Sequence, residues 1–161
     1  MSTDMTVLVV TADEGFGNSL DRMLNSKRFQ TKRATSLWGA LKAMPGSDIL
    51  VLAWSLPNGN SKELLDYWLR SGEAGPILVL SQETLAPCDV NSILQKAWNV
   101  MCAPFDLAQI GEIMERYAWI VRGERCCREV VKLRRRVNVL IVIVAALGGT
   151  QILVPLLQYL L

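Results

Sequence analysis

Five short strand-like runs, most of them strongly apolar, recur along the first 121 residues, and a segment with helical spacing follows each of them. Short apolar runs of this kind are typical of strands that are buried on both faces of a parallel sheet. The expected strands are Val7–Val10, Phe29–Arg33, Ile49–Ala53, Ile77–Leu80 and Val100–Ala103. The expected helices are Asn18–Leu24, Ser36–Met44, Ser61–Leu69, Val90–Trp98 and Leu107–Val121.

Strict alternation of strand and helix favours the α/β class, with helices covering both faces of one parallel sheet. The breaks between the elements fit this order, because Pro45 and Gly46 end one helix before the next strand begins. Ser36 is a plausible N-cap for the helix that follows it. Another small doubly wound fold remains open on this pattern alone.

The C-terminal segment has a different composition from the rest of the chain. Arg136 is the last charged residue of the 161, and Val137–Leu161 holds no Asp, Glu, Lys or Arg. We therefore expect three parts, namely a domain over residues 1–121, a basic juxtamembrane helix or linker over 122–136, and a transmembrane helix over 137–161.

The length of this uncharged segment suits a membrane. As a helix it would extend about 37 Å at ~1.5 Å per residue, which exceeds the ~30 Å hydrocarbon core of a bilayer. A buried core helix would be shorter and would carry a polar stripe. Because the chain ends at Leu161, the segment is predicted to be a single-pass tail anchor.

A basic collar comes directly before the anchor, formed by Lys132, Arg134, Arg135 and Arg136. Positive charge stays on the cytoplasmic side, so we expect the N-terminal domain to be cytoplasmic. The collar would attract anionic lipid headgroups. Residues 122–136 carry seven basic and two acidic side chains and so contribute +5, whereas the formal net charge of the whole chain is only +2. The rest of the chain is thus acidic, about −3 by difference, which argues against a nucleic-acid partner.

The anchor also contains features that favour a partner helix. Gln151 lies near its middle, where an amide prefers a hydrogen bond to a neighbouring helix. Ala145 and Gly149 form a small-xxx-small pair that permits close helix approach. We expect Ala145, Gly149 and Gln151 to contact another transmembrane helix, for example in a membrane protein complex, although a single anchor can also tolerate one glutamine and a few glycines.

The sequence offers few residues for catalysis or for metal binding. It contains no histidine, which removes the commonest general base and metal ligand. The four cysteines, Cys88, Cys102, Cys126 and Cys127, form no Cys-x-x-Cys pair. No nucleophile–base pair or phosphate-binding loop is apparent, so we expect no enzymatic activity, no metal and no cofactor.

Four stretches in order resemble bacterial response-regulator receiver domains, over roughly Thr6 to Val121. They are Asp48–Pro57, Lys62–Leu65, Ile77–Ser81 and Ala103–Asp106, the last resembling the Lys-Pro-Phe-Asp signature of that family. The resemblance implies a flavodoxin-like, five-stranded parallel sheet in the order 2-1-3-4-5, with ligands at the carboxyl ends of the strands.

The same resemblance implies phosphoryl transfer onto an aspartate at the end of the third strand. It also implies an acidic pair after the first strand to hold Mg²⁺, a hydroxyl and a lysine. The matching positions here are Thr11 and Ala12 for the acidic pair, Ala53 for the nucleophile, Ser81 for the hydroxyl and Ala103 for the lysine. We interpret the chain as a degenerate member, a pseudo-receiver that is not a phospho-acceptor. The resemblance to bacterial domains also implies that the expected membrane is a bacterial inner membrane.

A shift in register restores only part of such a site. Moving the first strand by one or two residues would bring in Asp13 and Glu14. No shift brings a carboxylate to the end of the third strand, because Asp48 lies at its opposite end.

These observations together predict a non-catalytic protein-binding module at the cytoplasmic face of a membrane, acting as an accessory subunit of a larger membrane complex. Two alternatives remain open. One is a membrane-tethered signalling adaptor that recruits a soluble partner. The other is a sensor that binds a small ligand in the vacated phospho-acceptor pocket.

Overall fold

The computed structural model describes residues 5–56, 61–71, 75–83, 85, 87–127, 129–130 and 133–134. The chain divides into two compact units, Met1–Val121 and Arg122–Leu161. The predicted transmembrane helix over residues 137–161, with Ala145, Gly149 and Gln151, lies outside the described residues. Within the described residues, no helix is both long and apolar enough to cross a membrane.

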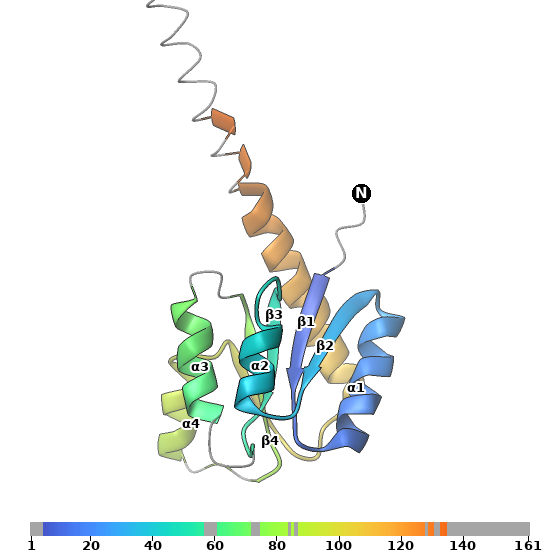
Figure 1. Ribbon diagram of the computed structural model, residues 1–161, viewed down its shortest axis with the longest axis vertical. Coiled ribbons are helices and arrows are strands. Elements are labelled where there is room, and N and C mark those ends of the chain that lie inside the picture. The colour runs from blue at the N-terminus through green and yellow to red at the C-terminus, as the bar shows by residue number, and fades with distance from the viewer. Residues whose placement is uncertain are drawn as a thin grey trace, which may run out of the picture. The chain divides into compact units, whose positions relative to one another are not determined.

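The first unit is built on one parallel sheet of five strands (Figure 1). The strands are β1 (Met5–Val10), β2 (Phe29–Ala34), β3 (Ile49–Ala53), β4 (Ile77–Ser81) and β5 (Asn99–Cys102). Their order across the sheet is β2-β1-β3-β4-β5, and every neighbouring pair is parallel. This confirms the predicted α/β class and the predicted order 2-1-3-4-5.

Helices cover both faces of the sheet. They are α1 (Glu14–Ser26), α2 (Leu37–Ala43), α3 (Ser61–Arg70), α4 (Pro87–Leu94) and a last helix that covers residues 107–121 of this unit. Leu20 and Leu24 of α1 pack in one cluster with Ile110 and Met114 of the last helix. The other face is covered by α2, α3 and α4, which contribute to a second cluster.

The interior strand β1 divides its side chains between these two clusters. Val7 and Val9 belong to the cluster beneath α1, whereas Leu8 and Val10 belong to the cluster beneath α2 and α3. Successive side chains of a strand point to opposite faces, and all four of these are buried. A continuous apolar run is therefore what a strand between two helical layers requires.

Two helix starts are set by side-chain caps. The Ser36 hydroxyl accepts a hydrogen bond of 3.2 Å from the Gly39 N–H, which confirms Ser36 as the N-cap of α2. The Asp13 carboxylate accepts one of 3.0 Å from the Phe16 N–H. Because of this second cap, α1 begins at Glu14, four residues before the helix expected from apolar spacing alone.

The predicted helix Val90–Trp98 was wrong in position. Helix α4 begins at Pro87 and ends at Leu94. The Trp98 N–H then donates a hydrogen bond of 3.0 Å to the Ile77 carbonyl at the start of β4. Trp98 thus belongs to the entry into β5, which begins at Asn99 and ends one residue before the predicted Ala103.

Candidate functional site

The carboxyl ends of β1, β3, β4 and β5 meet at one edge of the sheet. Val10 pairs with Leu52, Ala53 pairs with Leu80, and Ser81 pairs with Cys102. The residues that end these strands or follow them therefore lie along one line. Four of the five positions that the receiver resemblance singled out, Thr11, Ala53, Ser81 and Ala103, come together in this way, and Ala12 follows Thr11.

At the end of β1, backbone contacts hold the turn into α1. The Thr11 N–H donates a hydrogen bond of 3.1 Å to the Ala34 carbonyl, and the Thr11 hydroxyl accepts one of 3.2 Å from the Asp13 N–H. Thr11 is buried and Ala12 is exposed. The Asp13 carboxylate caps α1. Strand β1 ends at Val10 in register with β3, so the two residues that follow the strand are Thr11 and Ala12, and no shift in register brings Asp13 to their place.

At the end of β3, Ala53 is partly buried and carries only a methyl group. The Ser61 hydroxyl, at the first residue of α3, lies 3.1 Å from the Ala53 carbonyl and 2.5 Å from the Trp54 carbonyl. The Trp54 N–H donates a hydrogen bond of 2.7 Å to the Leu80 carbonyl of β4. The start of α3 is thus tied to the end of β3 by a buried hydroxyl.

At the ends of β4 and β5, Ser81 is fully buried, and its hydroxyl donates a hydrogen bond of 2.8 Å to the Glu83 carbonyl. The Ala103 side chain is exposed, and its peptide bond to Pro104 is cis. The Ser81 hydroxyl is therefore already engaged by its own turn, and the neighbouring strand offers no cationic side chain at Ala103.

The described part of this edge is poor in the groups that hold a metal ion. Among the described residues, no three side chains of His, Cys, Asp or Glu gather closely enough to form a metal site. Mg²⁺ prefers carboxylate oxygens, and the side chains at the four strand ends are two hydroxyls and two methyl groups. This chemistry suits a neutral, hydrogen-bonded surface better than an ion site.

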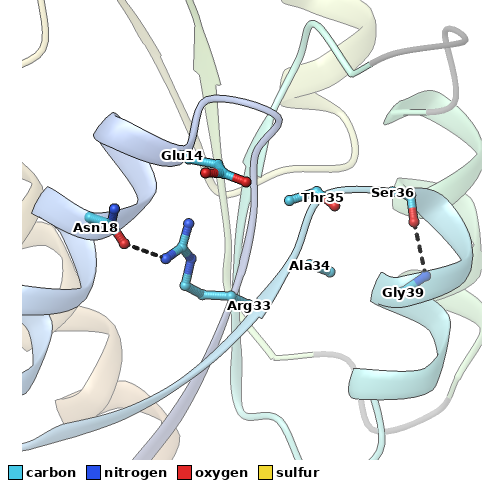
Figure 2. Close-up of a pocket in the computed structure, with 7 residues that line it drawn as sticks. All are labelled: Glu14, Asn18, Arg33, Ala34, Thr35, Ser36 and Gly39. Atoms are coloured by element: carbon cyan, nitrogen blue, oxygen red, sulfur yellow. Dashed lines mark hydrogen bonds between the residues drawn. The ribbon is translucent and has the colours of Figure 1, made fainter.

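A second feature at the same edge was not predicted from the sequence. A hollow of about 480 Å³ lies beside the carboxyl end of β2. Figure 2 shows its lining, with α1 on one side and the turn before α2 on the other. The lining residues are Glu14, Asn18, Arg33, Ala34, Thr35, Ser36 and Gly39. They come from two stretches separated by 14 residues of chain, so no local motif could have indicated them.

The predicted basic collar falls mostly outside the described residues. Lys132, Arg135 and Arg136 are not described, whereas Arg134 is helical and exposed. Residues 122–127 are also helical, and Cys126 and Cys127 among them are exposed free thiols.

Solved structures with the same fold are numerous, whereas no protein-family model and no curated protein sequence matches the chain. A CheY-like receiver domain from Methanospirillum hungatei superposes with a TM-score of 0.66 at 17% identity, covering 76% of this chain and 99% of its own. The non-phosphorylated HemR receiver domain from Leptospira biflexa gives 0.64 at 24% identity, covering 71% and 94%. Chemotaxis protein CheY4 from Vibrio cholerae gives 0.64 at 17% identity, covering 71% and 99%.

Identities this low show the fold, and the coverage shows that nearly the whole of each receiver domain has a counterpart here. The sheet order and the flanking helices described above agree with these superpositions. The chain therefore contains a domain with the fold of a CheY-like response-regulator receiver.

Proposed function

We propose that this protein is a non-catalytic, phosphorylation-independent signalling module that binds other proteins at the cytoplasmic face of a membrane. In this proposal residues 137–161 anchor the chain, and the protein serves as an accessory subunit of a larger membrane complex. The receiver fold itself supports a role in signalling.

The single observation that carries this proposal is the side chain at the end of β3. A receiver that accepts a phosphoryl group needs a carboxylate oxygen there as the nucleophile, and Ala53 supplies a methyl group. Neighbouring positions agree, because the Ser81 hydroxyl is engaged by Glu83 and Ala103 replaces the lysine of the family signature. A domain that lacks this chemistry can still bind other proteins through its surface.

The membrane part of the proposal is supported by sequence. Val137–Leu161 carries no charge, and basic residues come directly before it. On the positive-inside rule, this order keeps the receiver-fold domain in the cytoplasm. Gln151 and Gly149 favour a helix partner in the membrane, which is why we prefer an accessory subunit to a free adaptor.

The proposal is tested by fractionation and protease accessibility of the full chain carrying an N-terminal epitope tag. The tagged chain should stay in membranes after a high-pH wash, and a chain that ends at Gly123 should be found in the soluble fraction. Protease should remove the tag in inverted vesicles but not in intact cells. A full chain that washes off the membrane would contradict the anchor, and tag loss from intact cells would contradict the orientation.

A further inference from the structure

The hollow beside β2 contains side chains of both charges. Glu14 comes from the first turn of α1, and Arg33 comes from the end of β2. In Figure 2 the Glu14 carboxylate and the Arg33 guanidinium lie near one another at the α1 side, and Thr35 lies between them and Ser36. The hollow has a volume of about 480 Å³, opens to solvent and is lined mainly by polar atoms, so it suits a small polar ligand.

Two contacts hold Arg33 in place and use only two of its three guanidinium nitrogens. The Arg33 Nη1 donates a hydrogen bond of 2.6 Å to the Asn18 Oδ1, and the Nε lies 3.4 Å from the Asp21 Oδ2. Among the described residues, the Nη2 has no hydrogen-bond partner. The guanidinium also packs over Gly17, since a Cβ at that residue would lie 2.6 Å from the Nη2.

One carboxylate at the hollow has no cationic side chain to balance its charge among the described residues. Asp21 already offsets much of the charge of Arg33, and within the described part of the chain Glu14 has no ion-pair partner. A ligand that fills the hollow should therefore bring an ammonium group for Glu14. The open Nη2 of Arg33 can in turn donate to a carboxylate.

Polar groups complete the lining on the opposite side. Thr35 and Ser36 carry hydroxyls, and the Ser36 hydroxyl already accepts the Gly39 N–H as the cap of α2, which leaves its proton free to donate. Both hydroxyls can bond a short polar side chain of a ligand.

From this arrangement we propose that the hollow is a binding site for a small zwitterion of the α-amino acid class. Glu14 receives the ammonium group, Arg33 binds the carboxylate, and Thr35 and Ser36 contact the side chain of the ligand. The site is separate from the strand-end positions Ala53 and Ser81, and the inference does not depend on the proposed membrane role.

The test is calorimetric titration of the full chain in mild detergent with glycine, L-serine and L-glutamine. N-acetyl-L-serine, which lacks the ammonium charge, and L-serinamide, which lacks the carboxylate, serve as ligands with a single charge. We expect at least one zwitterion to bind saturably, with each single-charge derivative of serine at least tenfold weaker than serine. Saturable binding should also shift the backbone amide resonances of Thr35, Ser36 and Gly39.

The matched variants are Glu14→Gln and Glu63→Gln. Glu63 lies in the first turn of α3 and outside the hollow, so the same change is made in the first turn of another helix. We expect Glu14→Gln to weaken zwitterion binding at least tenfold and Glu63→Gln to leave it unchanged. The proposal is overturned if none of the three zwitterions binds, if one single-charge derivative binds as well as serine, or if both variants behave alike.

Discussion

The Ala103 N–H donates a hydrogen bond of 2.9 Å to the Ser81 carbonyl, so the two residues that the receiver resemblance matches to its lysine and its hydroxyl lie side by side. A lysine at residue 103 could therefore contact a ligand that also binds the Ser81 hydroxyl. Here the pair offers one hydroxyl, already bonded to Glu83, and one methyl group.

We therefore predict no phosphorylation when the full chain is incubated with acetyl phosphate and Mg²⁺. Intact-mass spectrometry before and after incubation checks this, with an active receiver domain as the control. Ala53→Asp alone should also remain unmodified, because Thr11, Ala12 and Ala103 still supply neither metal ligands nor a lysine. A mass increase of one phosphoryl group on the unaltered chain would show the interpretation of these positions to be wrong.

A second prediction concerns Gly75, where two backbones approach closely. A Cβ at Gly75 would lie 1.8 Å from the Asp48 carbonyl oxygen, and the Gly75 carbonyl also accepts the indole N–H of the buried Trp68 at 3.1 Å. Because a backbone atom cannot swing aside, Gly75→Ala should lower the free energy of unfolding by about 2 kcal/mol or more.

Gly15→Ala is the control for Gly75→Ala. A Cβ at Gly15 in α1 would meet only the Asp13 carboxylate, at an ordinary 3.4 Å. The same substitution there should be neutral or stabilising by up to about 1 kcal/mol, since alanine favours a helix over glycine. Urea denaturation followed by near-ultraviolet circular dichroism gives both values, and equal effects would contradict the close approach at Gly75.

A third prediction is a loss of stability at high pH that depends on Tyr117. Burial raises the pKa of Tyr117 to about 12, although the charge of Arg116 opposes the shift. The ring is 4% exposed and packs edge-on against Trp98, with the ring centroids 5.7 Å apart. The buried phenol is therefore held in its neutral form.

The sign of the pH effect follows from proton binding. Between pH 10 and about 12 the folded chain keeps the Tyr117 proton while the unfolded chain releases it, so stability that is complete below pH 10 falls across this window. The complete loss should be roughly 2–3 kcal/mol, of which roughly 1 kcal/mol has occurred by pH 11. Urea denaturation of the full chain and of Tyr117→Phe at pH 9 and pH 11 measures it, because other groups titrate in both proteins. Equal losses in the two proteins would contradict the prediction.

A fourth prediction concerns the tail. If Gln151 bonds to a partner helix, Gln151→Leu should keep the protein in the membrane and reduce the yield of co-purifying chains. An interhelical hydrogen bond of this kind contributes roughly 0.5–2 kcal/mol. Gly149→Leu should reduce the yield further by blocking close approach. Quantitative mass spectrometry at matched expression measures the partners, and full retention in both variants would mean that the tail only anchors.

The sequence predicted the strands better than the helix ends. β3 was located to the residue, because strands buried on both faces read as continuous apolar runs. Helix α4 was misplaced because Leu94 and Trp98 have helical spacing, although Trp98 enters β5 and packs against Tyr117. Tertiary contacts decide such an end, and a single sequence does not contain them.

The candidate site was predictable only where it follows the strand order. Ala53 and Ser81 could be placed at one edge because parallel strands end together. The hollow beside β2 could not be predicted, because Glu14 and Arg33 meet through the packing of α1 against β2, where the absence of a side chain at Gly17 makes room for the guanidinium. Spacing along the chain gives no sign of that contact.

Among the residues that the structure describes, the two apolar clusters on either side of the sheet have no buried residue in common. The layer formed by α2, α3 and α4 can therefore accumulate substitutions, and acquire a new outer surface, without requiring compensating changes beneath α1 and the last helix. Substitutions can in this way adapt the helical layer on one face of the sheet to a new binding partner, while the layer on the other face stays unchanged.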